Sequence, residues 1–154
     1  MKQLFTILLL LVSAYISAQS NLKIQNFLAL PIISLSDLDA ALHRNNFEMH
    51  DTAQTDSTMQ LVYKDKARSS MIVINRNLNT HANLTYSFYG DPENQRLSDD
   101  LQTQKFKLVS SNNIDGVLEK HYIRDDFSIS IYRKFDKINN VNMYMYSFTV
   151  KRDK

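Results

Sequence analysis

Apolar and polar residues alternate over most of the chain, in a pattern that predicts β-strands. A period of two indicates a strand with one buried face, because successive side chains point to opposite sides. In the first half of the chain the pattern predicts strands near residues 47–50, 59–64, 71–75 and 84–89. In the second half it predicts strands near residues 106–109, 117–124, 127–135 and 141–151.

Each run of strands follows a segment with helical spacing. Leu38 and Leu42 fall on one helical face, which predicts a helix over about 36–45 with Ser36 as its N-cap. A second helix carries Leu97 and Leu101. It is expected to begin with Asp91 as the cap and Pro92 at its first position, where a missing N–H costs little.

The segment from Leu22 to Ile33 is apolar but has no clean period. The sequence leaves open whether it is an edge strand, a helix or a flap.

The tripeptide Tyr86-Ser87-Phe88 recurs as Tyr146-Ser147-Phe148, and other matches lie in the same order before each copy. The offset between matched residues varies between 57 and 62, as short loop insertions would cause. Two copies are too few for a solenoid, so the sequence predicts two tandem repeats in one pseudo-symmetric domain, at about 34–90 and 91–152. The expected fold class is α+β: each repeat is a helix followed by three to four antiparallel strands, and the helices lie on one face of the sheet.

This order of elements is similar to that of the secreted β-lactamase inhibitor proteins. Those proteins also pair two helix-plus-sheet units and bind through a sheet surface. The resemblance rests on element order and on no sequence motif, and a shared fold does not assign a function.

Matching the repeats assigns the strand residues to two faces of the sheet. The predicted core positions, beneath the helices, are Ile72, Ile74, Leu84, Tyr86, Phe88, Ile129, Ile131, Tyr144, Tyr146 and Phe148. Their neighbours point to the opposite face. The candidate binding residues on that face are Val62, Met71, Val73, Tyr89, His121, Ile123, Tyr132, Met143 and Met145.

The opposite face is more apolar than expected of a sheet surface in water, which is normally polar. One hypothesis is that it binds a partner, because large apolar patches mark interaction sites and Met and Tyr suit recognition. The alternatives are that Leu22–Ile33 or a second copy of the protein covers it.

Residues 1–18 have the layout of a secretory signal peptide: Lys2, an apolar run of about thirteen residues, and a small residue at Ala18. The run is shorter than the roughly 20 residues that cross a bilayer, so cleavage is expected to leave no membrane anchor. The remaining residues, 19–154, are expected to form a single exported domain, periplasmic or secreted, and the absence of cysteine excludes disulfides.

Removing Lys2 from the 18 basic residues leaves 17 against 16 acidic ones, so the formal charge falls from +2 to +1. Such a balance does not favour nucleic acid as a partner.

Candidate chemistry is sparse. Glu119 and His121 share a face of one predicted strand and could hold a metal with Asp125 or Asp126 as a third ligand. Only two glycines occur, which argues against a glycine-rich phosphate loop, and no motif implies a cofactor or a catalytic residue. The sequence therefore predicts a non-enzymatic binding module for a protein, peptide or lipid-like partner. The alternatives are a structural envelope protein that homodimerises through the same face, or a small metal-dependent hydrolase.

Overall fold

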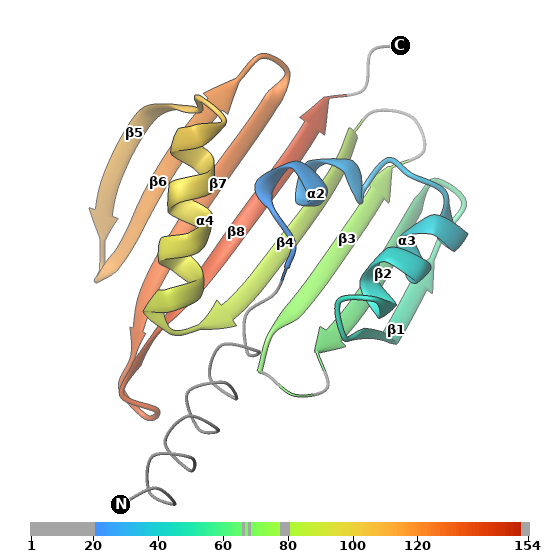
Figure 1. Ribbon diagram of the computed structural model, residues 1–154, viewed down its shortest axis with the longest axis horizontal. Coiled ribbons are helices and arrows are strands. Elements are labelled where there is room, and N and C mark those ends of the chain that lie inside the picture. Colours follow the sequence, from blue (N-terminus) through green and yellow to red (C-terminus); the bar gives the residue numbers. More distant parts are fainter. Residues whose placement is uncertain (1–20, 66, 68, 78–80, 152–154) are drawn as a thin grey trace, which may run out of the picture.

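All the strands of the described chain belong to one antiparallel sheet (Figure 1). The computed structural model describes residues 21–65, 67, 69–77 and 81–151. They form an α+β domain in which three short helices pack on an eight-stranded sheet. The strands are β1 (Phe47–Gln54), β2 (Thr58–Asp65), β3 (Met71–Asn77), β4 (His81–Tyr89), β5 (Lys107–Ile114), β6 (Val117–Arg124), β7 (Phe127–Asp136) and β8 (Val141–Lys151).

The strand order is β1-β2-β3-β4-β8-β7-β6-β5, so β4 and β8 form the centre of the sheet. Each half is a meander of sequential strands, and within the sheet the two halves are joined where β4 pairs with β8. Tyr86 pairs with Tyr146 in this central ladder. The two copies of the repeated tripeptide therefore lie side by side in the middle of the molecule.

The outermost strands carry the same irregularity. The register shifts between Met49 and Asp51 in β1, and between Leu108 and Ser110 in β5. Such bulges bend an edge strand and increase its twist. No sequence pattern predicted them.

The register corrects how the two halves match. Ile72 pairs with Tyr86, whereas its counterpart Ile129 pairs with Phe148. The strand ladders therefore equate Tyr86 with Phe148 and not with Tyr146. The tripeptide match made from the sequence is shifted along β8, although it places both tyrosines on the correct face.

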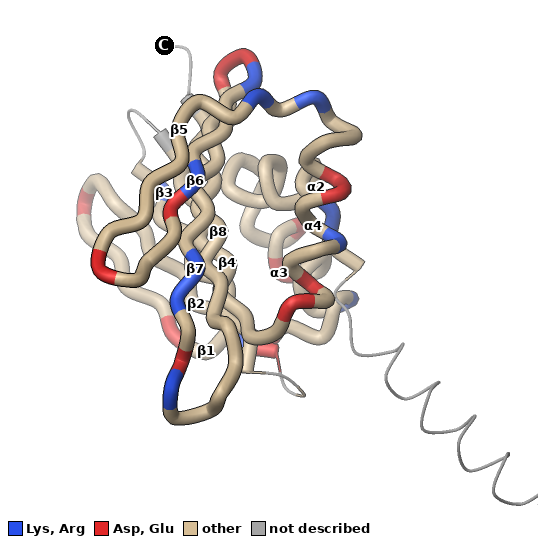
Figure 2. Tube along the Cα trace, turned by 90° about the vertical axis from the view of Figure 1, so that its left-hand side faces the viewer, with Lys and Arg blue, Asp and Glu red and all other residues tan. Residues whose placement is uncertain are grey.

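Three helices lie on the same side of the sheet (Figure 2): α2 (Ile24–Ala29), α3 (Leu35–His43) and α4 (Asp91–Thr103). Both predicted helices are present, but their caps differ from the prediction. Ser34, not Ser36, caps α3, because its side chain accepts a hydrogen bond from the Asp37 N–H at 3.1 Å.

The residue that precedes α4 is Gly90, so the helix begins at Asp91 and Pro92 occupies its second position. Gly90 has φ of 94°, a conformation that suits glycine, and its N–H donates to the Asn142 carbonyl at 2.9 Å. The Asp91 carboxylate does not cap the helix, since it accepts hydrogen bonds from the Tyr144 hydroxyl and the Asn142 amide.

The apolar segment from Leu22 to Ile33 contains α2 and packs on the helical side of the sheet. Phe27 is fully buried, and its ring stacks on Tyr86 and Phe148 at centroid distances of 4.9 and 5.0 Å. The hypothesis that this segment covers the opposite face is therefore wrong. The segment covers β4 and β8 on the helical side of the sheet, in the part that α3 and α4 leave uncovered (Figure 1).

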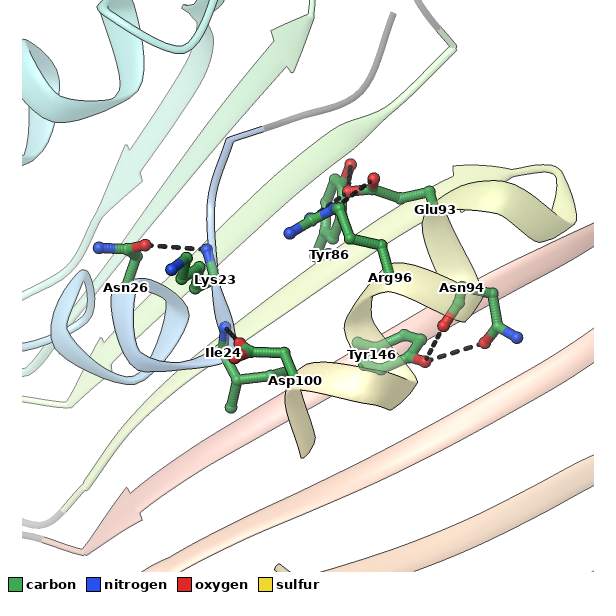
Figure 3. A network of polar contacts seen from close by, with 9 residues as sticks. All are labelled: Lys23, Ile24, Asn26, Tyr86, Glu93, Asn94, Arg96, Asp100 and Tyr146. Atoms are coloured by element: carbon green, nitrogen blue, oxygen red, sulfur yellow. Dashed lines mark hydrogen bonds and ion pairs between the residues drawn. The ribbon is translucent and has the colours of Figure 1, made fainter. Parts of the chain in front are cut away.

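Tyrosine hydroxyls fix α4 to the central strands (Figure 3). Tyr86 donates to Glu93 at 3.2 Å, and Tyr146 donates to the Asn94 side chain at 2.9 Å. The Asp100 carboxylate accepts a hydrogen bond from the Ile24 N–H at 2.6 Å, which joins α4 to α2.

The core prediction is confirmed. All ten predicted core residues are buried, and the apolar faces of the helices cover them. The hydrophobic effect of this burial is the main force that holds helices and sheet together.

The predicted signal peptide lies outside the described residues. No helix among the described residues is long and apolar enough to cross a membrane.

Candidate functional site

The side of the sheet that carries no helix, called here the helix-free face, presents one row of side chains that crosses every strand. Paired residues from β1 to β5 along this row are Asp51, Val62, Val73, Thr85, Ser147, Ser130, His121 and Ser110. Strand alternation puts all nine candidate binding residues on the same face. The register divides them into groups.

Five of them are neighbours and form what we call the methionine–tyrosine patch: Met71, Tyr89, Tyr132, Met143 and Met145. Tyr89 pairs with Met143, and Met145 pairs with both Tyr132 and Ser87. Ser87 in turn pairs with Met71, which completes the patch. Tyr89 is 41% exposed and Met145 is 36% exposed, so the patch is open to solvent along the two central strands.

The other four candidates are not part of this patch. Val62 and Val73 pair with each other on the neighbouring row. His121 and Ile123 lie beyond β7, where Ser130 and Ser128 are their partners. Ile123 is 43% exposed but isolated from the methionines.

Small hydroxyl side chains fill the middle of the face beside the patch. This hydroxyl patch consists of Thr85, Ser87, Ser128, Ser130, Ser147 and Thr149, which are paired neighbours on β4, β8 and β7. The centre of the helix-free face is therefore less apolar than expected, because these uncharged polar residues lie beside the methionine–tyrosine patch. The alternation of Ser128 and Ser130 with isoleucines is the sequence signal that indicates this feature.

Charged side chains on this face lie mainly on the outer strands. Glu48 pairs with Lys64 near one edge, and Glu119 lies on β6 near the other. Nearer the centre, Lys134 and Asp136 on β7 also lie on this face. The central strands thus offer a surface that a partner can cover without desolvating many charges.

The residues proposed as metal ligands have other partners. The His121 Nδ1 lies 3.0 Å from the Ser130 hydroxyl. Burial is the main cause that raises the pKa of the Tyr132 phenol, and a hydrogen bond to Glu119 raises it further. Tyr132 therefore stays protonated and can donate to that carboxylate. Within the part of the chain that the structure describes, no group of three or more His, Asp or Glu residues could hold a metal ion. The third ligand expected from Asp125 or Asp126 is not brought to the pair.

Comparison of the chain with models of known protein families, with curated proteins and with solved structures gives no significant match in any of the three.

Proposed function

We propose that this chain is an exported, non-enzymatic binding protein that recognises another protein through its helix-free face. The observation that carries the proposal is the exposed methionine–tyrosine patch on the central strands, with Tyr89 at 41% and Met145 at 36% exposure. The centres of protein interfaces are enriched in Tyr and Met and depleted of charge. The patch and its uncharged surroundings have this composition.

The chemistry of the two patches favours a protein over a purely apolar ligand. Methionine side chains adapt to irregular partner surfaces, and the tyrosine rings provide contact area with a polar end. The neighbouring hydroxyls can bond to main-chain groups or bridging water in a partner. A lipid-like ligand, which the sequence also allows, would leave the hydroxyl patch without such partners.

The alternative is a structural protein that homodimerises through the same face. The mature protein at micromolar concentration, analysed by sedimentation, tests this first. If the wild type sediments as a dimer and Met145→Asp sediments as a monomer, the helix-free face forms a homodimer, and the proposal of a different protein partner is wrong.

Site-specific cross-linking tests the main proposal. A photoreactive residue at position 145 is expected to capture a defined protein from an envelope extract, and the same residue at exposed position 36 on α3 is not. Tyr132→Glu should abolish capture from position 145, because it places a second carboxylate beside Glu119 within the interface. Equal capture from positions 36 and 145 would refute the use of this face.

We also infer that the domain arose from two tandem repeats arranged pseudo-symmetrically about the β4–β8 pair. Each half begins with a helix on the same side of the sheet and continues with a four-stranded meander. The bulge in the first strand of each half, after Met49 and after Leu108, supports the inference further.

A further inference from the structure

The tip of the β7–β8 hairpin carries a cluster of exposed apolar side chains. Ile138, in the turn, is 94% exposed, the highest value for a large apolar side chain in the described part of the chain. Phe135, near the end of β7, is 50% exposed. Both side chains line one hollow at the tip together with Met143 of β8. Clustered apolar surface is unfavourable in water, so this arrangement indicates a surface that meets a partner.

The hairpin projects from the body of the protein. It extends past the end of β4 and the start of α4 in Figure 1, and in the side view of Figure 2 its tip is again outermost among the described elements at that end. A projecting tip offers a convex surface with apolar groups at its end.

Hydrogen bonds to one carboxylate hold the turn in shape. Asp136 accepts from the Ile138 N–H at 2.9 Å, from the Asn139 N–H at 3.3 Å and from the Asn139 side-chain amide at 2.8 Å. Ile138 is therefore held in its exposed position before any partner binds, which lowers the entropy lost on binding. The same hydrogen bonds use the Asp136 carboxylate within the turn.

Basic side chains lie directly behind the apolar tip. Lys134 and Lys137 are exposed and line the same hollow as Ile138. Arg133 is not counted with them, because it lies close enough to Asp91 for their opposite charges to attract. Two lysines against the one carboxylate of Asp136 leave a net charge of +1 at the tip.

We propose that this hairpin docks the protein on a membrane surface that contains anionic lipids. Ile138 enters first, and Phe135 lies three residues behind it, which is at most roughly 10 Å along a strand. Apolar surfaces that bind at the membrane interface reach about 5–10 Å into the boundary between headgroups and acyl chains, so both side chains can be buried there. The lysine stems can extend along the apolar surface while their ammonium groups meet lipid phosphates.

A membrane fits this tip better than a second protein does. A protein would need a matching pocket for a narrow convex hairpin, whereas lipids rearrange around it. The contact is peripheral and reversible, because two apolar side chains bury less surface than a myristoyl chain, which itself binds only marginally. The net positive charge at the tip adds about fivefold in affinity for an anionic surface.

Co-sedimentation with lipid vesicles tests the proposal on the mature protein. One set of vesicles contains phosphatidylcholine alone, and the other contains phosphatidylcholine mixed with phosphatidylglycerol. We expect saturable binding to the mixed vesicles, about fivefold weaker binding to the neutral ones, and loss of this difference at high salt. No binding to the mixed vesicles at millimolar lipid, or equal binding to both sets at low salt, would overturn the proposal.

Ile138→Ser is the decisive variant, because it removes the outermost apolar side chain from a position with few contacts to the fold. Its affinity for the mixed vesicles should fall about tenfold, with unchanged stability in urea. Ile32→Ser is the matched control. Ile32 is also exposed but lies beside Phe127, at the opposite end of β7, and its loss should not change vesicle binding. If Ile138→Ser binds as tightly as the wild type, the tip is not the contact.

A second pair of variants tests the charge. Lys137→Gln should bind the mixed vesicles about fivefold more weakly and the neutral ones equally well. Lys107→Gln changes the net charge by the same amount. Lys107 is at the start of β5, which runs in the direction of β7, so it lies at the end of the sheet away from the tip, and its variant should bind as the wild type does. Equal losses in the two variants would mean that the whole protein is attracted without a docking site, and the proposal would be wrong.

The hairpin tip and the protein-binding face can be tested separately. A detergent-solubilised envelope extract contains no bilayer, so Ile138→Ser should leave cross-linking from position 145 in that extract unchanged. Vesicle binding in turn needs no protein partner. Failure of either experiment therefore rejects its own proposal and leaves the other standing. Loss of cross-linking in Ile138→Ser would show that the tip contacts the protein partner, which would overturn its assignment to a membrane.

Discussion

Truncation of Phe27 is the most direct test of how the N-terminal segment packs. Phe27 is fully buried and its ring stacks on both Tyr86 and Phe148. Replacing a buried phenylalanine by alanine costs about 3–5 kcal/mol, and each lost ring pair contributes to that cost. Because α2 has only six residues, it has little helical stability of its own and depends on this contact. We therefore expect Phe27→Ala to lower the free energy of unfolding by about 4 kcal/mol.

Urea denaturation measures this loss. With a slope of about 2 kcal/mol per molar urea, the midpoint should fall by about 2 M. Phe27→Leu, which refills part of the volume, should lose about 1–2 kcal/mol and keep the fold if the alanine variant unfolds. Ile32→Ala is the matched control in the same segment, because Ile32 is 49% exposed, and it should change stability by less than about 0.5 kcal/mol. If Phe27→Ala costs no more than Ile32→Ala, the segment does not pack on the central strands.

Three further predictions concern the contacts that position α4 and the turns. Tyr146→Phe removes a buried hydroxyl that donates to Asn94 at 2.9 Å, and should cost about 1 kcal/mol of unfolding free energy in urea. The hydrogen bond from Tyr144, and to a smaller extent that from Asn142, lowers the pKa of Asp91 in the folded protein below its usual 3.8. The contribution of the Asp91 carboxylate to stability is therefore present above pH 3.8 and is lost as the pH falls through the pKa of the folded state. Asp91→Asn should remove that part of the acid dependence below pH 3.8, and an unchanged pH profile would show that the carboxylate has no such role. Gly116 has φ of 79°, and nothing lies within 4 Å of a Cβ added there. Gly116→Ala should therefore lower the free energy of unfolding by about 1 kcal/mol, and with it the melting temperature, through backbone strain alone. A neutral effect would contradict the turn geometry.

Much of the fold was predictable because one physical rule, burial of alternate strand residues, governs the central strands. Ile72 and Ile74 are buried, whereas Met71 and Val73 are half-buried and Asn75 is exposed, as the alternation predicts. The rule fails at β5, where every residue is exposed and no apolar period appears. It also fails for the segment around α2. Phe27 is buried within the helix, and Leu22 and Leu30 are buried beyond its ends, so the buried residues of the segment do not follow a helical period.

The candidate site was less predictable, because a sheet surface depends on which residues are paired. Alternation assigns Met145 and Tyr132 to one face, but only the register shows that they are neighbours. At the edges of the sheet the register also shifts at the bulges after Met49 and Leu108, which leave no clear sequence signal.

The two halves of the chain carry more similar residues on the helical side of the sheet than on the helix-free face. On the helical side, matched positions keep their character, such as Ile72 with Ile129 and Tyr86 with Phe148. On the helix-free face the central row changes from valines in the first half to serine and histidine in the second: Val62, Val73 and Thr85 correspond to His121, Ser130 and Ser147.

A core tolerates little change in volume, so its agreement between the halves is expected from packing alone. The helix-free face carries no such constraint, and its central row differs between the halves: the first half presents valines, whereas the second presents serines and a histidine. A partner that lay across this row, as proposed, would contact two different chemistries. The row as a whole, and neither half alone, would then fix the orientation of that partner.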